Sequence, residues 1–336
     1  MSHPIVRRTV AAAVALGLAA VGLAGCSSSS DTAEASAEGY PLTLDSPYGE
    51  TVLEEQPERV AVVSSVDLDI ALALGVVPVI SPLYGDSALD PWEEDALAAL
   101  GESELATFDS TDGVDYEAIA AAEPDVILAT SGWTLDEDYE QLSKIAPIVS
   151  YIGEDGLSSM TWAERTEVAA TALGLSDEGD EVIANVAAQF EEAAAAHPEF
   201  AGKTFTYAVI HPDQITYISY AGSDVSFFTD LGFVLPDTAE QFSEADSAVS
   251  RENVDLLDAD VLLVGYPFGD EGLLSRDALE GDALFQQIPA VAGGHYAVVD
   301  DAVASPLAYP TPLSELWLLD QLVPVLSDAV AGDGGQ

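Results

Sequence analysis

The amino-acid sequence predicts an α/β protein with two lobes, each built on a mainly parallel sheet, joined by a long α-helix. The first observation behind this prediction is that short, β-branched apolar runs alternate with helical stretches. Strands buried on both faces of a parallel sheet carry such runs, and helices connect them. The second observation is that this alternation occurs twice, in residues 40–158 and again in residues 201–330. The third is that residues 159–200, between the two halves, are almost wholly helix-forming.

The first 25 residues are typical of a secretory signal peptide. Arg7 and Arg8 precede an apolar run, residues 9–25, which contains no acid. A run of about 17 residues is at the lower limit for spanning a bilayer, which favours removal over retention. Leu23-Ala24-Gly25-Cys26 resembles the lipobox of bacterial lipoproteins, which implies that Cys26 carries a lipid and becomes the new N-terminus. We therefore expect an exported protein, lipid-anchored to the outer face of the cell membrane.

Cys26 is the only cysteine, so an intramolecular disulfide or a thiolate metal site is not available. Residues 26–39 are rich in Ser, Ala and acidic residues and contain no large apolar residue before the end of the segment. Such a composition cannot bury a core and predicts a flexible tether.

The N-terminal lobe, residues 40–158, is divided into elements by its apolar runs and by Gly and Pro. The expected elements are a hairpin through residues 42–52, strand 59–63, helix 68–74, strand 76–80, helix 116–122, strand 126–129, helix 139–144 and strand 148–151.

The helical region, residues 159–200, has one break at residues 174–177. Ser176 is the predicted N-cap of the second helix. Apolar residues then recur at three- and four-residue spacing, and His197-Pro198 stops the helix. A helix of roughly 20 residues is about 30 Å long, enough to run across both lobes.

The C-terminal lobe, residues 201–330, returns to the alternating pattern. Its expected elements are strands 204–210, 215–219, 261–264 and 296–299 and helices 226–232, 253–257 and 313–326.

The charge of the chain excludes nucleic-acid binding as a main function. All 60 acidic residues but only six of the eight basic residues follow residue 25, which leaves a net charge of −54 with neutral histidines. Nucleic-acid recognition requires lysine and arginine to neutralise phosphates. The acidity is consistent with a well-solvated shell suited to a salty environment, or with attraction of cationic ligands.

Four segments resemble the binding proteins for iron-siderophores, haem and cobalamin, and two of them resemble the iron-siderophore branch in particular. The likeness covers about residues 55–328, and the order and spacing of the segments carry it more than any single one. The segments are residues 57–79, residues 116–128, Tyr139-Glu140-Gln141-Leu142-Ser143-Lys144-Ile145-Ala146-Pro147, and Pro312-Leu313-Ser314-Glu315-Leu316-Trp317.

This resemblance implies the substrate-binding component of an ABC importer, which captures a ferric siderophore in a cleft between the lobes without chemistry. Iron then enters only as part of the bound chelate, and no cofactor is expected. The resemblance also implies a monomer that docks on a permease dimer through one glutamate per lobe. The matching residues are Glu117 and Glu252, whose carboxylates would accept paired hydrogen bonds from permease arginines.

A rule independent of the family nominates the ligand-binding residues. In open α/β sheets, ligands bind beyond the carboxyl ends of the strands. Aromatic residues gather in the loops at these positions, and they suit a large, partly apolar chelate. The candidates are Tyr84, Trp133, His211, Tyr220, Tyr266, Phe268 and Tyr309, with Trp133 and Tyr266 the strongest.

The scarcity of basic residues favours a hydroxamate siderophore. Relatives that bind carboxylate or catecholate siderophores carry arginines in the pocket, whereas the loop at Trp133 has no basic residue. Arg251 and Arg276 are the candidates to face the cleft. Ferric hydroxamates are neutral or cationic, so they fit an acidic, aromatic cleft better.

Several alternatives stay open. Haem binding would need an axial ligand, for which His211 is the candidate, and cobalamin belongs to the same group of ligands. Direct zinc or manganese capture would need converging ligands, but His197, His211 and His295 have no close ligand spacing. A secreted acidic enzyme would show a motif such as Gly-x-Ser-x-Gly, which the sequence lacks. A ligand-free adhesin or signalling lipoprotein is the remaining reading.

Overall fold

The N-terminal lobe contains a three-stranded parallel sheet in the order β3 (Val60–Val62), β6 (Val126–Ala129) and β7 (Ile148–Ser150). The computed structural model describes residues 39–85, 87–152, 160–266 and 272–335, all within one unit, residues 36–336. The expected signal peptide, the Cys26 expected to carry a lipid, nearly all of the expected tether and Phe268 lie outside these residues. None of the helices in the described part is long and apolar enough to cross a membrane.

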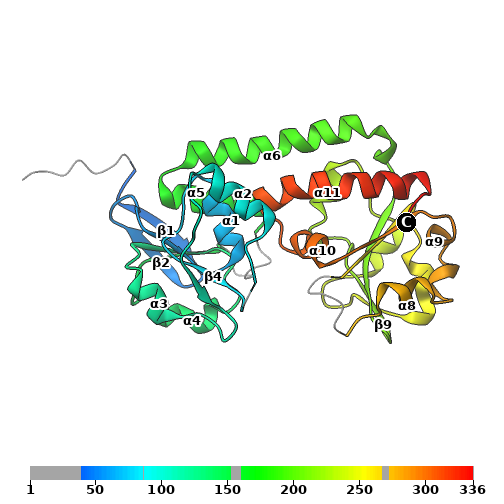
Figure 1. The fold of residues 1–336 in the computed structure, drawn as a ribbon, viewed down its shortest axis with the longest axis horizontal. Helices are drawn as coiled ribbons and strands as arrows, with labels where there is room; N and C mark the ends of the chain where they lie inside the picture. The colour runs from blue at the N-terminus through cyan, green and yellow to red at the C-terminus, as the bar shows by residue number, and fades with distance from the viewer. Residues whose placement is uncertain (1–38, 86, 153–159, 267–271, 336) are drawn as a thin grey trace, which may run out of the picture. The chain divides into compact units, whose positions relative to one another are not determined.

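Short strands and four helices complete the N-terminal lobe (Figure 1). The hairpin β1-β2 is antiparallel, and β4 pairs with β5 in parallel. The elements are β1 (Leu42–Ser46), β2 (Gly49–Leu53), β3 (Val60–Val62), α1 (Ser65–Ala73), β4 (Ser81–Leu83), α2 (Pro91–Ala99), β5 (Thr107–Asp109), α3 (Tyr116–Ala121), β6 (Val126–Ala129), α4 (Leu135–Leu142) and β7 (Ile148–Ser150). The predicted strand at 76–80 is wrong, since the Val76 N–H still bonds back to Ala71 of α1. The Val79 N–H then donates to the Val60 carbonyl and Ile80 forms a bridge with Ala61, but the strand itself, β4, begins at Ser81.

The C-terminal lobe contains one five-stranded sheet in the order β10-β9-β8-β11-β12. Strands β8, β11 and β12 are parallel, whereas β8, β9 and β10 pair antiparallel, so the sheet is mixed. The elements are β8 (Phe205–Ile210), β9 (Gln214–Tyr217), α7 (Ser226–Asp230), β10 (Ala248–Ser250), β11 (Val261–Gly265), α8 (Arg276–Glu280), α9 (Pro289–Ala292), β12 (Tyr296–Val299) and α10 (Asp301–Ala308). Short 3₁₀ helices lie at Pro198–Phe200, Asp237–Gln241, Arg251–Leu257 and Phe285–Gln287.

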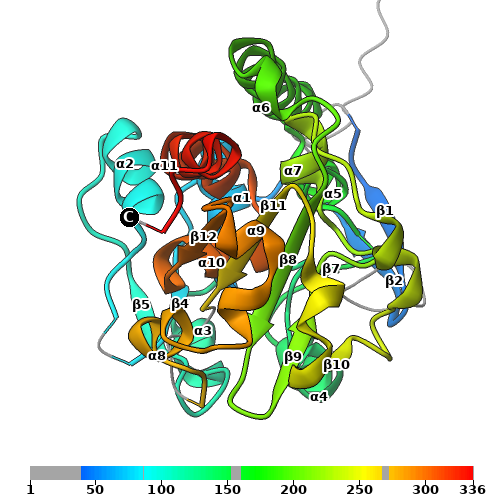
Figure 2. The ribbon, with the colours of Figure 1, turned by 90° about the vertical axis from the view of Figure 1, so that its right-hand side faces the viewer.

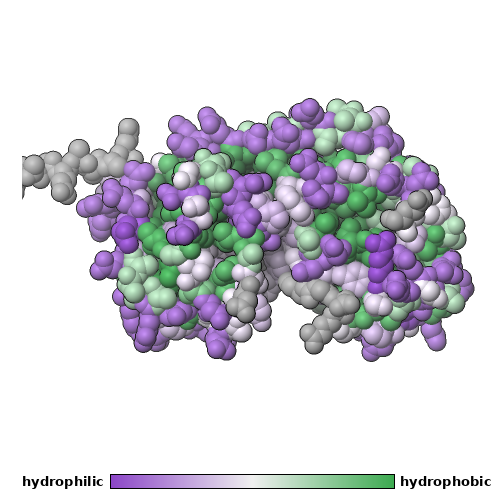
Figure 3. All heavy atoms as spheres, in the orientation of Figure 1, coloured by the Kyte–Doolittle hydropathy of each residue, from purple (hydrophilic) through white to green (hydrophobic). Residues whose placement is uncertain are grey.

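Two helices precede the C-terminal lobe, α5 (Trp162–Leu173) and α6 (Ser176–Ala196). Thr161 and Glu164 form a capping box at the start of α5. Helix α6 has the length that the sequence predicts, but Leu175 is its N-cap and Ser176 is its first residue. Gly179 allows α6 to approach α5, since a Cβ there would lie 2.6 Å from the Cβ of Ala170. Hydrophilic residues line the outer side of α6 along the upper edge of Figure 3.

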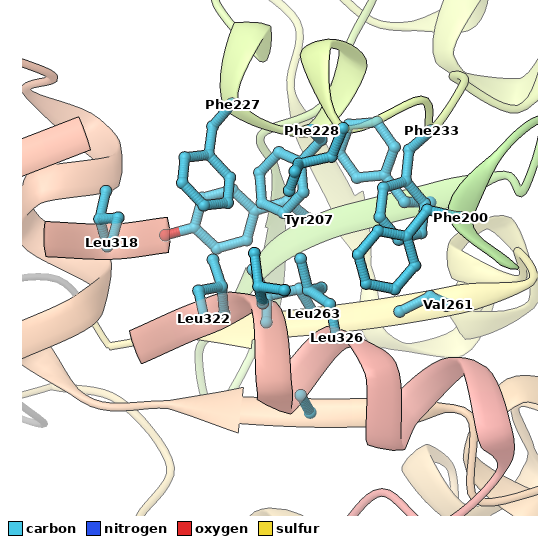
Figure 4. Packing of buried hydrophobic residues seen from close by; sticks show 14 of the residues in the cluster. Phe200, Tyr207, Phe227, Phe228, Phe233, Val261, Leu263, Leu318, Leu322 and Leu326 are labelled. Atoms are coloured by element: carbon cyan, nitrogen blue, oxygen red, sulfur yellow. The ribbon is translucent and has the colours of Figure 1, made fainter. Parts of the chain in front are cut away.

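The last helix, α11 (Pro312–Ala331), contacts both lobes. It packs on α1 and α2 at one end, on α6 along its length, and on β11 and β12 (Figures 1 and 2). Leu318, Leu322 and Leu326 enter the core of the C-terminal lobe among the rings of Phe227, Phe228 and their neighbours (Figure 4). Leu313 packs instead against the core of the N-terminal lobe. The two lobes are therefore joined by α11 as well as by the α5-α6 region, and the predicted α/β fold with mainly parallel sheets is confirmed.

Candidate ligand-binding site

A cavity of about 470 Å³ is lined by residues of both lobes. The N-terminal side comes from the start of α1, the loop after β6 and the start of α5. The C-terminal side comes from β8, the segment from β9 to α7, and the connection between α10 and α11. The lining residues are Val66, Ser131, Trp133, Met160, Arg165, Tyr207, Val209, Ile218, Tyr220, Gly222, Ser223, Asp224, Val225, Ser226, Phe227, Phe228, Glu244, Leu307, Ala308, Tyr309, Pro310 and Glu315.

This cavity differs from two other hollows in the described part of the chain. One, of about 440 Å³, lies beside α1, α6 and α11, and the other, of about 280 Å³, lies beside β1 and β7. Neither is lined by an aromatic residue. Binding sites for small molecules combine apolar and aromatic walls with a few converging polar groups, which favours the interlobe cavity.

Trp133 and Tyr309 form an aromatic edge of the cavity. Trp133 follows β6 and is 67% exposed, although tryptophan is usually largely buried. Its ring meets the ring of Tyr309 edge to face, with centroids 5.4 Å apart. Burial raises the pKa of Tyr309, and burial together with Glu244 raises that of Tyr220. Both phenols are therefore neutral hydrogen-bonding groups in the cavity lining.

Asp67 holds the loop that carries Trp133. Its carboxylate accepts hydrogen bonds from the backbone N–H and the hydroxyl of Thr130, at 2.9 and 2.6 Å. The Ser64 hydroxyl donates to the other oxygen of the same carboxylate, at 2.5 Å. The start of α1 is thus tied to the chain immediately after β6, which positions the tryptophan loop at the cavity.

Arg165 is the one basic residue among the described residues that line this cavity, and the sequence interpretation missed it. Burial lowers the pKa of its guanidinium, and the nearby charges of Asp67, Asp224 and Glu164 oppose that effect. The sequence does contain a signal that locates this residue. The capping box at Thr161 and Glu164 marks the start of α5, and this start places Arg165 in the first turn of the helix. Arg251 instead binds Asp282, at 2.9 Å, and Arg276 binds Glu280, at 2.8 Å.

The cavity brings together three of the seven nominated ligand residues, Trp133, Tyr220 and Tyr309. Tyr84, 67% exposed, does not line it. Tyr266 is buried in the core beside β11. A ring nitrogen of His211 lies 3.1 Å from the Thr216 hydroxyl across the β8-β9 hairpin.

Glu117 and Glu252 lie at the surface, each in the first turn of a short helix. Asp115 caps the start of α3, and the Ser250 hydroxyl accepts from the backbone N–H of Glu252. Both side chains are exposed. Within the described residues, no group of three or more His, Cys, Asp and Glu side chains is arranged to hold a metal ion.

The family model described as periplasmic binding protein matches residues 60–303, and the chain belongs to this family of binding proteins. No curated protein sequence matches the chain.

Solved structures share the fold over most of its length. PiaA of Streptococcus pneumoniae TIGR4, in complex with ferrichrome, is 31% identical with a TM-score of 0.73, covering 86% of this chain and 99% of PiaA. A periplasmic solute binding protein of Mycobacterium smegmatis is 26% identical with a TM-score of 0.71, covering 86% and 98% of the two chains. SirA of Staphylococcus aureus, complexed with staphyloferrin B, is 22% identical with a TM-score of 0.64 over 84% and 97%. At 22% identity, the similarity to SirA supports a shared fold and nothing further.

Proposed function

We propose that this chain is the substrate-binding component of an ABC importer and captures a ferric siderophore outside the cell membrane. The observation that carries the proposal is an aromatic cavity between the lobes in a chain 31% identical to PiaA, which was solved with ferrichrome. The protein would bind the intact chelate and transform nothing. Iron would then be cargo held by the chelate rather than a resident cofactor.

A hydroxamate siderophore fits the cavity best. Its lining carries three acidic residues, Asp224, Glu244 and Glu315, against the single Arg165. An anionic chelate would meet net repulsion here, whereas a neutral or cationic one would not. Ferrichrome is itself a neutral ferric hydroxamate.

We assign ligand contacts to Trp133, Tyr220 and Tyr309 and add Arg165. Aromatic faces would pack on the apolar arms of the chelate, and the guanidinium would donate hydrogen bonds to its oxygen atoms. Tyr84, His211 and Tyr266 do not line the cavity and are left out of this assignment, and Phe268 lies outside the described residues.

Tryptophan fluorescence of the purified protein, titrated with ligands, tests the function. The panel holds ferric hydroxamates, a catecholate, ferric citrate, haem and cobalamin. We expect saturable quenching by a hydroxamate, and Trp133→Ala should weaken binding about tenfold or more, since buried tryptophan contacts contribute about 2 kcal/mol or more. Tyr84→Ala is the matched control, because Tyr84 is equally exposed but lies outside the cavity. A folded protein that responds to none of these ligands would contradict the proposal.

We also propose that Glu117 and Glu252 dock on the permease and that a lipid on Cys26 holds the protein at the membrane. The protein would act as a monomer. Replacing both glutamates by alanine should abolish siderophore uptake by cells while ligand affinity in solution stays unchanged. Glu181→Ala with Glu191→Ala removes the same charge from the exposed side of α6 and serves as the control. Equal uptake by both double variants would refute the docking assignment, and a Cys26→Ser protein that stays in the membrane fraction would refute the anchor.

A further inference from the structure

Glu315 places a carboxyl group in the cavity, and none of the basic residues in the described part of the chain forms an ion pair with it. It lies in the first turn of α11, is only 3% exposed, and belongs to the cavity lining. Among the described residues, no hydrogen bond or ion pair is found at its carboxyl, and its oxygens are not among the fully enclosed polar atoms that lack a partner, so they open on the cavity. The surrounding protein removes most of the water around this carboxyl, so a bound ligand that donates hydrogen bonds to it would replace the lost hydration.

The groups around Glu315 are acidic. The negative charges of Asp224, in the segment before α7, and of Asp230, at the end of α7, both raise the pKa of its carboxyl. Arg165 reaches the cavity from α5. Burial lowers the pKa of its guanidinium, and the negative charges of Asp67, Asp224 and Glu164 raise it in part. Asp224 also accepts hydrogen bonds from the backbone N–H and hydroxyl of Ser226, at 3.1 and 2.7 Å, which fixes its position.

We propose that Glu315, supported by Asp224, forms a subsite for a cationic group, and that the bound chelate carries a primary ammonium arm. This inference rests on the proposed function and adds the chemical class of the ligand. An ammonium group supplies three N–H donors together with the positive charge that the surrounding carboxylates require. A neutral ligand at the same place would leave Glu315 without a partner.

The protonation of Glu315 gives the subsite a pH dependence. Burial, followed by the charges of Asp224 and Asp230, raises the pKa of Glu315 to about 8, so the free protein holds a proton there at neutral pH. Burial and Asp224 also raise the pKa of Asp230. An arriving ammonium favours the ionised carboxylate, so binding at pH 7 releases roughly one proton. The affinity for a cationic chelate should therefore rise as the pH rises from 6 to 8.

Two ligands that share a ferric hydroxamate centre and differ at the end of one arm test this inference. Ferrioxamine B carries a primary ammonium arm, and N-acetylated ferrioxamine B has the same ferric hydroxamate centre without that charge. Calorimetric titration of the purified protein should show about tenfold tighter binding of the ammonium form, as expected for a charge-assisted hydrogen bond. Titration in two buffers of different ionisation enthalpy measures the proton released.

Glu315→Gln should remove both the preference for the ammonium form over the acetylated form and the proton release. Glu181→Gln is the control, because it removes the same charge from an exposed residue of α6 that does not line this cavity, and it should keep the preference. Equal binding of the two ligands by the unmodified protein overturns the ammonium subsite but leaves siderophore capture intact. If the protein binds neither ligand and its fluorescence responds to none of the ligands of the wider panel, the proposed function is overturned instead. A preference that survives in Glu315→Gln overturns the assignment to this residue, and if that variant does not fold, the two-ligand comparison on the unmodified protein still decides.

Discussion

Asp69 and Glu93 form a buried pair of carboxyl groups in the N-terminal lobe, and we expect this pair to make the protein less stable as the pH rises. Asp69 on α1 is 3% exposed, and Glu93 on α2 is 4% exposed. The Asp69 carboxyl accepts hydrogen bonds from the Trp92 indole, at 2.8 Å, and from the Thr311 hydroxyl, at 2.6 Å. Burial raises the pKa of both groups, and the charge of Glu93 raises that of Asp69 further.

The magnitude follows from the pKa of Glu93, which burial raises from an ordinary value of 4.5 to about 7. Between these values the folded protein binds more protons than the unfolded chain, so stability falls as the pH rises. One pH unit corresponds to about 1.4 kcal/mol, which makes the total loss from this group about 3 kcal/mol. The contribution is fully present below pH 4.5 and is lost as the pH rises through 7.

Glu93→Gln removes the ionisable group of Glu93 while keeping the shape of the side chain. The amide oxygen can still accept the hydrogen bond that the Asp90 backbone N–H donates to Glu93, at 2.7 Å. Urea unfolding at constant ionic strength should show the variant about 2–3 kcal/mol more stable than the unmodified protein at pH 8.5 and about equal at pH 5. Glu94→Gln, one residue along the same helix and exposed, removes the same charge and should leave the pH dependence unchanged. Parallel stability curves for the Glu93→Gln variant and the unmodified protein would refute the reasoning.

Two further predictions concern packing, and both are read from urea unfolding. Gly179→Ala should destabilise the protein by about 1–3 kcal/mol, because its Cβ would lie 2.6 Å from that of Ala170 on α5; unchanged stability would mean that α5 and α6 are not held this close. Leu322→Ala in α11 should cost about 2–5 kcal/mol, since Leu322 is fully buried beside Phe227 and Phe228, and a loss below 1 kcal/mol would contradict that burial.

The buried strands and the long helix could be predicted because their patterns are local. β6, β8 and β11 are uninterrupted apolar runs, and α6 has apolar residues at helical spacing that ends at His197-Pro198. Strand β9 was predicted without its antiparallel direction, although the short turn after β8 leaves no room for a parallel crossover. The strands β4 and β5 were missed because neither is an apolar run: β4 has a proline at its centre, and β5 has a single apolar residue, Phe108.

Helix α2 was missed although the sequence contains its start signal, an Asp90–Glu93 capping box with Pro91 at the first helical position. The signal was overlooked because the apolar residues that follow are few, so the helical period is weak. Local capping chemistry would have located this helix where hydrophobic periodicity did not.

The candidate site could be predicted only in part. The rule that ligands bind beyond strand ends led to Trp133 and Tyr220, because each loop after its strand does face the other lobe. The same rule nominated Tyr266, whose ring turns into the core instead, and loop position alone does not decide which way a ring points. Arg165 and Glu315 reach the cavity from helices, so their contribution depends on how α5 and α11 pack across the lobes.

The packing of α11 has a consequence for the order in which the protein can fold during synthesis. The N-terminal lobe is made first, yet its buried Asp69 takes a hydrogen bond from Thr311, and its core receives Tyr309 and Leu313. Until those residues leave the ribosome, the lobe lacks a polar partner and part of its apolar cover. The first half of the chain therefore stays incomplete until the last helix arrives, and the stable fold belongs to the finished chain.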